Sequence, residues 1–356
     1  MNGKKETAIP VNAFLGERKC GSRVVSRNLE KEAVEHSLRQ SYRGSEDAIE
    51  KKLGRETIRK RVIGNGEKAG TLEKTRRQTE IIEEKNSKDA GSETDHYKKS
   101  RGGPVRNVFA KIFGRRALYF MADGVGVERQ YKSDEKRKGK RECKVGVFLS
   151  QAGEAVKELG TFCTWGRVNE FGKMAEWLLL KILMPFIPVI IISDGAKWIR
   201  NLRNKIPRLK KAVWILDWFH LKDNLLALFR VFGPDEESQT AETATGWLWR
   251  GNTERALEII NRLPFSDDEN EKKKQAAAVK KFRTYLKNQK EGIVNYQAYK
   301  MRGYLVGSGY MEKRNDTLIK NRMVRQGRMR WGLKGGEAMM QLLTARMNGR
   351  LDEVFA

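Results

Sequence analysis

Residues 117–130, ALYFMADGVGVERQ, carry the pattern from which the fold is interpreted. The run from Ala117 to Ala122 is apolar throughout and is typical of a buried strand, yet Asp123 follows it directly. Burying a carboxylate costs several kcal/mol unless a partner compensates its charge. Asp123 therefore indicates that something at the end of this strand binds a negative charge.

A second apolar strand ends in the same way. PVIIIS (188–193) is a β-branched run typical of a fully buried strand, and Asp194 and Gly195 follow it. A glycine after the acid lets the backbone turn and approach a ligand closely. Carboxylates at the ends of adjacent strands converge on one edge of an open α/β sheet, where such sheets place their sites. One Asp-Gly alone is more often a turn, but two that close apolar strands favour a site.

Glu312 is the third acidic position, and it follows GSG at the start of a predicted helix. Clustered carboxylates repel one another unless a cation neutralises them, and Mg²⁺ or Mn²⁺ takes such oxygen ligands. Two ions ~3.5–4 Å apart can activate an attacking oxygen and stabilise the leaving oxygen of a phosphodiester. We therefore expect Asp123, Asp194 and Glu312 to gather around divalent ions, with two ions expected.

The overall charge indicates a polyanionic partner. The 356-residue chain has a net charge of +27, and an excess of this size is typical of proteins that bind nucleic acid. A basic protein of the membrane surface is the alternative, but no amphipathic anchor helix is evident. Hydrophobic residues make up 39% of the chain, which is enough for a sizeable core in two or three domains.

Cysteines and apolar segments indicate the compartment. Cys20, Cys143 and Cys163 are scattered and form no C-x-x-C, which argues against a disulfide framework and a zinc ribbon. The N-terminal sequence has no apolar signal-peptide core. The apolar segment 177–193 contains a lysine and two prolines, so we interpret it as a helix end and a buried strand rather than a membrane span. We expect a soluble cytoplasmic protein that associates with the nucleoid and does not bind membranes.

Residues 1–106 are predicted to form a helical, partly flexible DNA-binding region. Within it, residues 41–66 are typical of a helix-turn-helix with its turn at Gly54 and its second helix at 55–62. Residues 67–106 are interpreted as a linker.

The helix-turn-helix is predicted from apolar and basic residues at helical spacing. The first helix is expected to run through Ala48, Ile49 and Leu53, and Ile58 and Val62 share the buried face of the second. The basic residues of the second helix are expected to face solvent, where a DNA major groove accepts them: Arg55, Arg59, Lys60 and Arg61. A solvated helical hairpin is the alternative.

From residue 107 the pattern alternates between strands and helices. Strands are predicted at 117–123, 143–150, about 159–165, 188–193 and 211–216, and helices at 168–183, 196–206 and 217–232. Residues 107–232 then form the first part of an α/β core, 233–303 an all-helical insertion, and 304–356 the C-terminal helices that complete the core. This order, with acids on the first strand, the fourth strand and a late helix, is that of an RNase H-like fold, a mixed sheet flanked by helices.

Five segments, in this order, are similar to bacterial insertion-sequence transposases of the Mutator-like DDE group. They are DGVGV (123–127), SDGAKWI (193–199), LDWFHL (216–221), GSGYMEK (307–313) and GRMRWGLKGGEAM (327–339). The resemblance covers roughly residues 107–350. It implies that Asp123, Asp194 and Glu312 are the catalytic triad, and that the helical stretch between the last two is the insertion such transposases carry.

LDWFHL places Asp217 and His220 in D-x-x-H spacing, where the related transposases have a C/D-x-x-H motif. The chain has only 3 histidines and no cysteine pair nearby, so a zinc site is not favoured. We interpret His220 as a catalytic-site residue that contacts DNA phosphate or supports the acids. The alternative is that Asp217 caps a helix and His220 only packs.

Basic residues crowd the segment after Glu312 and are predicted to bind DNA phosphates. They are Lys313, Arg314, Lys320, Arg322, Arg325, Arg328, Arg330 and Lys334. Trp331, among them, is a candidate for stacking on an unpaired base. A solvated basic face and a tryptophan packed in the core are the alternatives.

Together these patterns predict a metal-dependent transposase. It would hydrolyse phosphodiester bonds at the ends of a mobile element, and the freed 3′-hydroxyl would attack target DNA. Its partners would be double-stranded DNA and at least one further copy of the chain, since two ends must be joined. The alternatives are an RNase H-like nuclease without strand transfer and a catalytically silent or truncated DNA-binding protein. A general RNA-binding protein explains the charge but not the placed carboxylates.

Overall fold

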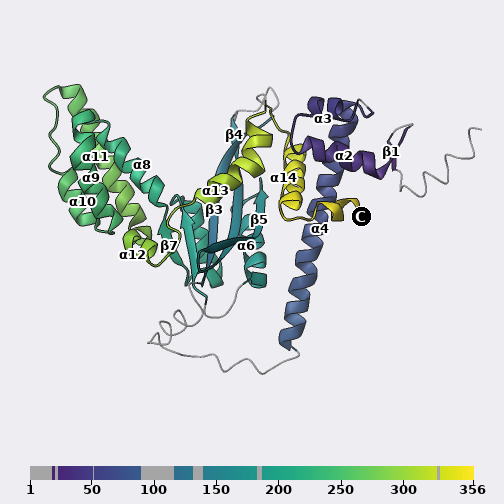
Figure 1. Cartoon of the computed structure of the whole chain (residues 1–356), viewed down its shortest axis with the longest axis horizontal. Coiled ribbons are helices and arrows are strands. Elements are labelled where there is room, and N and C mark those ends of the chain that lie inside the picture. The colour runs from purple at the N-terminus through teal and green to yellow at the C-terminus, as the bar shows by residue number, and fades with distance from the viewer. Residues whose placement is uncertain are drawn as a thin grey trace, which may run out of the picture.

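A five-stranded mixed sheet forms the centre of the protein (Figure 1). The computed structural model describes residues 18–20, 23–50, 52–89, 116–130, 139–182, 187–326 and 329–356. The sheet contains β3 (Arg116–Glu128), β4 (Lys140–Ala152), β5 (Ala155–Thr164), β6 (Val189–Ser193) and β7 (Val213–Leu216), in the order β5-β4-β3-β6-β7. β4 runs antiparallel to β3 and β5, whereas β6 runs parallel to β3 and β7. This arrangement confirms the predicted α/β class.

Two helices make the parallel crossovers. α6 (Val168–Ile182) connects β5 to β6, and α7 (Lys197–Lys205), followed by the short turn η1 (Pro207–Leu209), connects β6 to β7. The predicted division of segment 177–193 is confirmed, because α6 ends at Ile182 and β6 begins at Val189. Within the described residues, no helix combines the length and the apolar character needed to cross a bilayer.

The two faces of the sheet bury different side chains, because neighbouring residues of a strand point to opposite faces. On one face Phe120 stacks on Phe148 at 4.8 Å between ring centroids, and Phe171 of α6 completes this aromatic layer through Phe162. The opposite face receives the C-terminal helices. Asp123, three residues after Phe120, points to this second face, where it meets a C-terminal helix.

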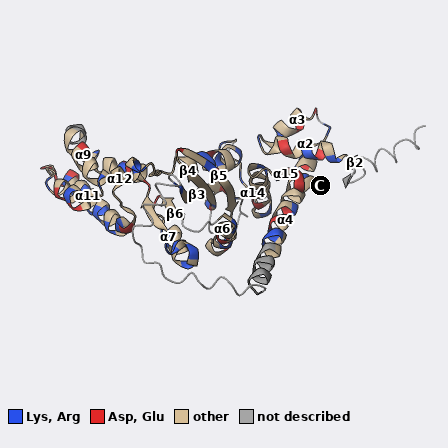
Figure 2. Ribbon diagram, turned by 60° about the horizontal axis from the view of Figure 1, so that its bottom comes forward, with Lys and Arg blue, Asp and Glu red and all other residues tan. Residues whose placement is uncertain are grey.

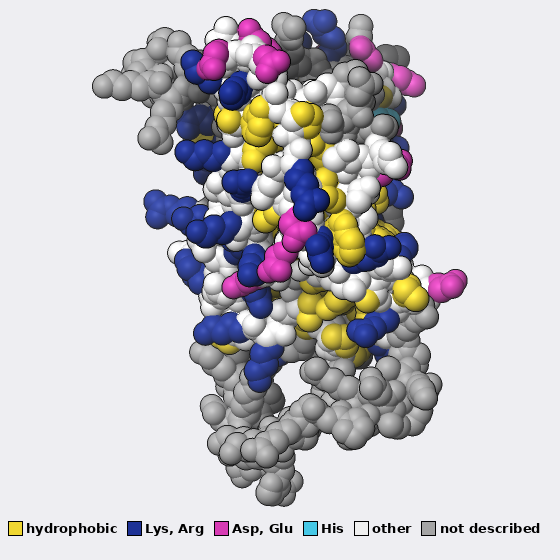
Figure 3. Space-filling model, turned by 90° about the vertical axis from the view of Figure 1, so that its left-hand side faces the viewer, with side chains coloured by type: hydrophobic (Ala, Val, Ile, Leu, Met, Phe, Trp, Pro, Cys, Tyr) yellow, Lys and Arg dark blue, Asp and Glu magenta, His cyan; other side chains and the backbone are white. Residues whose placement is uncertain are grey.

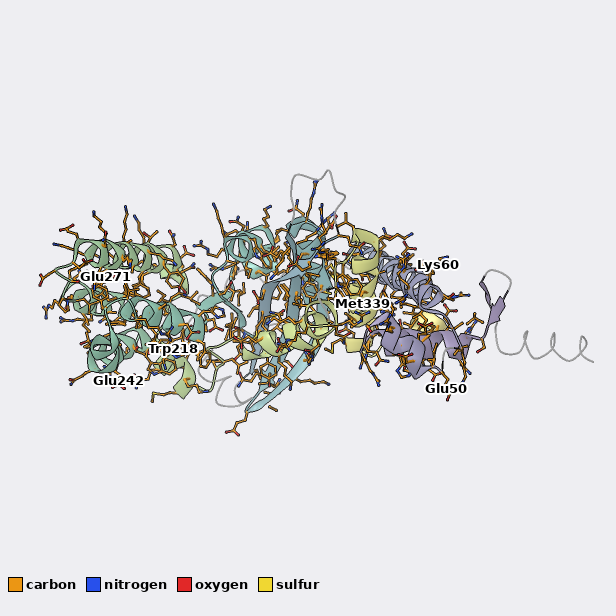
Figure 4. All side chains as sticks on the ribbon, turned by 90° about the horizontal axis from the view of Figure 1, so that it is seen from above. Glu50, Lys60, Trp218, Glu242, Glu271 and Met339 are labelled. Atoms are coloured by element: carbon orange, nitrogen blue, oxygen red, sulfur yellow. The ribbon has the colours of Figure 1, made fainter. Side chains whose placement is uncertain are left out.

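α8 (Trp218–Phe229) follows β7, and helices follow it in the segment predicted as an all-helical insertion, residues 233–303. These are α9 (Pro234–Trp249), α10 (Thr253–Ile260), α11 (Glu269–Gln289), the turn η2 (Lys290–Gly292) and α12 (Tyr296–Met301). Trp218 lies where the insertion leaves the sheet (Figure 4) and packs against Trp249 and Tyr296, at centroid distances of 4.7 and 5.0 Å. The Tyr296 hydroxyl donates to the carbonyl of Leu216, so α12 is tied back to β7.

The C-terminal segment crosses the second face of the sheet. It contains α13 (Gly309–Arg314), a π-helix η3 (Asn315–Val324), α14 (Leu333–Met347) and α15 (Leu351–Phe355). The sequence predicted helix here but not its π character, in which hydrogen bonds such as Arg325 N–H to Lys320 O span five residues.

The N-terminal residues form a helical cluster beside α14 (Figure 1). It contains a small hairpin, β1 (Arg18–Cys20) and β2 (Arg23–Val25), and the helices α2 (Arg27–Ser37), α3 (Tyr42–Ala48) and α4 (Arg55–Asp89). The predicted pair of helices around Gly54 is present, and Ile58 and Val62 are fully buried as expected. The first of them ends earlier than predicted, at Ala48, although Ile49 and Leu53 are buried.

The predicted linker at 67–106 is wrong for residues 67–89, because α4 continues to Asp89. Its middle packs on α14 so closely that a Cβ at Gly66 would lie 2.3 Å from the carbonyl oxygen of Ala338. Arg76 of α4 also forms an ion pair with Glu353 at 2.6 Å. These contacts come from the other end of the chain and stabilise a helix that its own polar sequence does not predict. Residues 90–106 lie outside the described residues.

Candidate functional site

Asp123 and Asp194 lie at the same level on neighbouring parallel strands. Leu118 to Met121 of β3 pair with Val189 to Ile192 of β6, and each aspartate lies two positions beyond the last residue that pairs with the other strand. The predicted strand end at Asp123 is wrong, because β3 continues to Glu128 and Asp123 pairs with Val145 of β4. The parallel pairing still brings the two acids to the same level of the sheet, as expected. Their proximity is also expressed electrostatically, since the charge of Asp194 raises the pKa of Asp123.

The carboxylate of Asp123 is only partly compensated. Burial raises its pKa most, and the charge of Asp194 raises it further. The Gly124 N–H donates to Oδ1 at 2.7 Å and the Asn315 side-chain amide to Oδ2 at 2.6 Å, and both hydrogen bonds lower the pKa. The net result is a pKa above the usual value. A cation placed beside the two acids would stabilise the ionised carboxylate of Asp123 and lower its pKa.

Asp194 is held by a tight turn. Its Oδ1 accepts a hydrogen bond from Ala196 N–H at 2.8 Å, and Gly195 between them has φ +87°, a conformation that favours glycine. A Cβ at Gly195 would lie 2.5 Å from Oε1 of Gln289, whose amide donates to the Gly195 carbonyl at 3.1 Å. The end of α11 thus supports the turn that presents Asp194.

Asp217 is a buried structural group. It caps α8, accepting from Phe219 N–H at 2.7 Å and His220 N–H at 3.0 Å, and it also accepts from Ser308 N–H at 2.5 Å. Burial by itself raises the pKa of Asp217, but the hydrogen bonds from His220 and Ser308 outweigh it and hold the pKa below its usual value. The helix-capping interpretation is therefore correct, and Asp217 additionally binds the GSG segment to α8.

His220 carries a positive charge beside the acids. Its Nδ1 lies 3.6 Å from Oδ1 of Asp217, and its side chain is partly open to solvent. Asp217 raises the pKa of His220 to about 9, with smaller contributions from Asp194 and Asp123. A half-exposed imidazolium with a raised pKa can contact a phosphate oxygen, which is the role expected from the sequence.

Glu312 does not join Asp123 and Asp194 in this structure. Its side chain is exposed on α13, and within the described part of the chain it has neither a hydrogen bond nor an ion pair. Among the described residues, no three His, Cys, Asp or Glu side chains gather closely enough to hold a metal ion. The predicted convergence of three carboxylates is therefore met for two of them. Asn315, one turn after Glu312, holds the helix against Asp123 instead.

The two aspartates nevertheless fit a divalent cation of the magnesium type. Mg²⁺ commonly binds one or two carboxylates and keeps several waters. No hydrogen bond occupies Oδ2 of Asp194 among the described residues, and Oδ1 of Asn315 is buried without a hydrogen-bond partner there. This donor set offers oxygens and no soft ligand, which is the chemistry of Mg²⁺ or Mn²⁺.

The predicted DNA-binding residues divide into exposed and buried ones. Arg55, Arg59 and Lys60 are exposed on α4 at the end of the molecule opposite the helical insertion, as the labelled Lys60 and Glu271 show (Figure 4). Arg61 does not face solvent, because its Nη1 pairs with Glu30 at 3.3 Å.

Several basic residues after Glu312 form ion pairs with acidic side chains of the protein. Arg314 pairs with Glu158, and Lys320 and Arg325 pair with Asp316 at 3.1 and 3.0 Å. Lys334 is exposed and pairs with Glu67 at 2.9 Å. Lys313 and Arg330 are exposed, and Arg328 lies outside the described residues.

Arg322 and Trp331 are buried, which corrects their predicted contact with DNA. Arg322 is 1% exposed, and its guanidinium lies 5.3 Å from the ring centroid of Tyr42 and 4.9 Å from that of Trp331. Burial lowers the pKa of Arg322 to about 10, so the group stays charged near neutral pH. Trp331, 4% exposed, donates from Nε1 to the Met323 carbonyl at 3.1 Å. The core-packing alternative for Trp331 is correct.

Asn315 is the site residue that sequence reasoning missed. It lies in the buried stripe of its helix, between Met311 and Leu318, where a polar side chain needs a partner. That position, one turn after Glu312, is the signal that could have identified it.

The sequence was also compared with known proteins. A model of a protein family described as an uncharacterised protein family, UPF0236, matches residues 106–354. No curated protein and no solved structure matches the chain.

Proposed function

The chain belongs to the uncharacterised protein family UPF0236, and for this member we propose the function of a metal-dependent DDE transposase with an RNase H-like catalytic core. The observation that carries the proposal is that Asp123 of β3 and Asp194, directly after β6, lie at the same level of two adjacent parallel strands. Burial and the neighbouring charge of Asp194 raise the pKa of Asp123, and a cation placed there would stabilise its ionised form. The strand order, with three antiparallel strands followed by two parallel ones, supports the RNase H-like assignment.

Charge over the rest of the molecule supports a nucleic-acid partner. Lys and Arg residues lie on helices to both sides of the sheet (Figure 2), and they spread over the face that the helical insertion presents (Figure 3). The segment 196–211, which follows Asp194, contains 7 basic residues and no acidic one. A DNA backbone lying along such a surface would bring its phosphates to the site.

The residues have separate roles in this proposal. Asp123 and Asp194 would hold Mg²⁺ or Mn²⁺, which supplies charge stabilisation for phosphoryl transfer when bound. His220 would contact a non-bridging phosphate oxygen. Glu312 is proposed as the third acid, brought to the pair when DNA binds. Asp217 acts as a positioning residue, since it joins the helix of His220 to the segment that precedes Glu312.

Two displacements make up the reaction. Water attacks phosphorus at the element's end, and the broken P–O bond releases a 3′-hydroxyl. That hydroxyl then attacks a target phosphodiester, so one bond forms as another breaks and no external energy source is needed. Joining two ends requires at least two copies of the chain.

The exposed position of Glu312 favours one alternative, a catalytically silent DNA-binding protein. Incubating the full chain with Mg²⁺ and DNA carrying the sequences that flank its gene separates these functions. A transposase nicks that DNA at the element's ends and yields joined products with a target plasmid. A nuclease yields nicks alone, and a silent protein yields neither.

The matched variants make the test specific to the site. Asp194→Asn is expected to abolish both products, whereas Glu254→Gln, an exposed change on α10, is expected to retain them. Equal products from wild type and Asp194→Asn would contradict the proposal.

A further inference from the structure

Two aromatic side chains are exposed on the segments that carry the site. Phe219 is 58% exposed and lies between Asp217 and His220, and Tyr310 is 38% exposed and lies two residues before Glu312. Single exposed apolar side chains are common on protein surfaces. These two differ because both belong to the backbone that positions the candidate site, and neither was identified from the sequence.

The two segments are fastened to each other. Oδ2 of Asp217 accepts from Ser308 N–H at 2.5 Å, and Trp218 N–H donates to the Val306 carbonyl at 3.1 Å. Each of these contacts is within two residues of one of the two aromatic side chains. Phe219 and Tyr310 therefore lie on two segments that these hydrogen bonds join.

The ring of Phe219 rests on a glycine that makes room for it. A Cβ at Gly307 would lie 2.6 Å from Cε2 of Phe219, so a larger residue at 307 would displace the ring. The Phe219 N–H is also fixed by its hydrogen bond to Oδ1 of Asp217. One side of the ring thus packs against the backbone at Gly307, while more than half of the side chain stays exposed to solvent.

A fixed, exposed aromatic ring beside a phosphodiester site suits the face of a nucleobase. Stacking is tolerant of sequence, since every base has a π-face, and it requires the base to be unpaired. The neighbouring imidazolium of His220 offers a counter-charge for the phosphate of the same nucleotide. Trp331, the stacking candidate from the sequence, is buried and cannot act in this way.

We propose that Phe219, with Tyr310 beside the same segment, is a stacking platform for an unpaired base next to the Asp123–Asp194 pair. This inference rests on the proposed function, because it takes nucleic acid as the ligand. It adds that the ligand has at least one base splayed out of the duplex at the reacting end.

Binding without catalysis tests the platform. The full chain is titrated in Ca²⁺ with a blunt duplex and with the same duplex bearing a three-nucleotide 3′ overhang that contains 2-aminopurine. Wild type is expected to prefer the overhang and to quench the probe's fluorescence. Phe219→Ala is expected to bind the overhang about tenfold more weakly, with blunt-duplex affinity unchanged. Phe219→Trp is expected to restore both readouts.

A matched control variant and two contradicting outcomes complete the test of the platform. Phe265→Ala removes an aromatic side chain that is 42% exposed on the helical insertion, and it is expected to behave as wild type. The platform is overturned if wild type shows no preference for the overhang, or if Phe219→Ala keeps that preference and the quenching. If overhang binding depends on Phe219 but the chain never cleaves DNA, the stacking platform is supported and the proposed transposase function is contradicted.

Discussion

The acid pair and the buried Arg322 both bury charge, yet the structure treats the two differently. Asp123 faces a second acid, and its hydrogen bonds from Gly124 and Asn315 do not bring its pKa back to the usual value. Arg322 has no ion-pair partner within the described residues, but two aromatic rings flank its guanidinium and Nε donates to the Ser37 carbonyl.

The difference separates a buried structural site, at Arg322, from a site that can bind a ligand, at the acid pair. Arg322 is buried between the N-terminal helices and η3, where its guanidinium contacts two aromatic rings and a backbone carbonyl, although its Nη2 has no hydrogen-bond partner among the described residues. Asp123 lies in β3 and Asp194 follows the neighbouring strand β6, while the side chain of His220 is half open to solvent. A cation from outside the protein can therefore compensate the raised pKa of Asp123. Changes at Arg322 should therefore affect stability first, and changes at the acids should affect ligand binding first.

The largest expected effect is on stability, from Arg322→Ala. The variant loses two cation–π contacts and leaves a cavity between Tyr42 and Trp331, so we expect the free energy of unfolding to fall by ~3 kcal/mol. Urea unfolding measures this, and Arg325→Ala, an exposed neighbour, should change it by less than ~0.5 kcal/mol. A loss below about 1 kcal/mol for Arg322→Ala would show that the cluster is not a buried structural site.

Gly195→Ala should destabilise the site of the acid pair through its backbone. A Cβ at φ +87° is strained and would meet Gln289, and we expect a loss of ~1–2 kcal/mol. The control is Gly246→Ala in α9, where an added Cβ meets open space and should stabilise by ~0.5–1 kcal/mol. Thermal unfolding of both variants checks the opposite signs. The same sign for both would contradict the account of the turn.

Asp123→Asn should stabilise the metal-free protein at neutral pH. Because the folded-state pKa of Asp123 is raised, the ionised carboxylate destabilises the fold at pH values above that pKa. We expect a gain of ~0.5–1 kcal/mol near pH 7 that disappears below about pH 4. Unfolding across this pH range in EDTA measures it, with Asp267→Asn on an exposed loop as the control. A variant less stable than wild type at pH 7 would show that the acid pair is already satisfied.

His220→Gln should give the smallest effect, and one that depends on pH. The folded-state pKa of His220 is raised to about 9, so its ion pair with Asp217 stabilises fully below about pH 6.5. The stability difference between wild type and variant should then shrink as the pH rises through about 9. Thermal unfolding between pH 6 and 10 follows this loss, with His36→Gln in α2 as the control. A difference independent of pH would exclude the charged pair.

The strands and the acid pair could be predicted because their signals are local. The apolar run at 117–122 and the β-branched run at 188–193 mark buried strands, and the parallel pairing of these strands brings Asp123 and Asp194 together. The long α4 could not be predicted, since close packing of Gly66 on α14 stabilises it. The burial of Arg322 could not be predicted either. It lies in a run of basic residues that reads as exposed, and it is buried against Tyr42, which is far away in the sequence.

The central claim is that Asp123 and Asp194 together bind a divalent cation. Electron paramagnetic resonance of Mn²⁺ titrated into the full, DNA-free chain tests it directly, with Asp194→Asn and Glu254→Gln measured in parallel. We predict a bound Mn²⁺ signal that Mg²⁺ displaces in wild type and Glu254→Gln, and its loss in Asp194→Asn. Equal Mn²⁺ binding by all three proteins, or by none of them, would contradict the account.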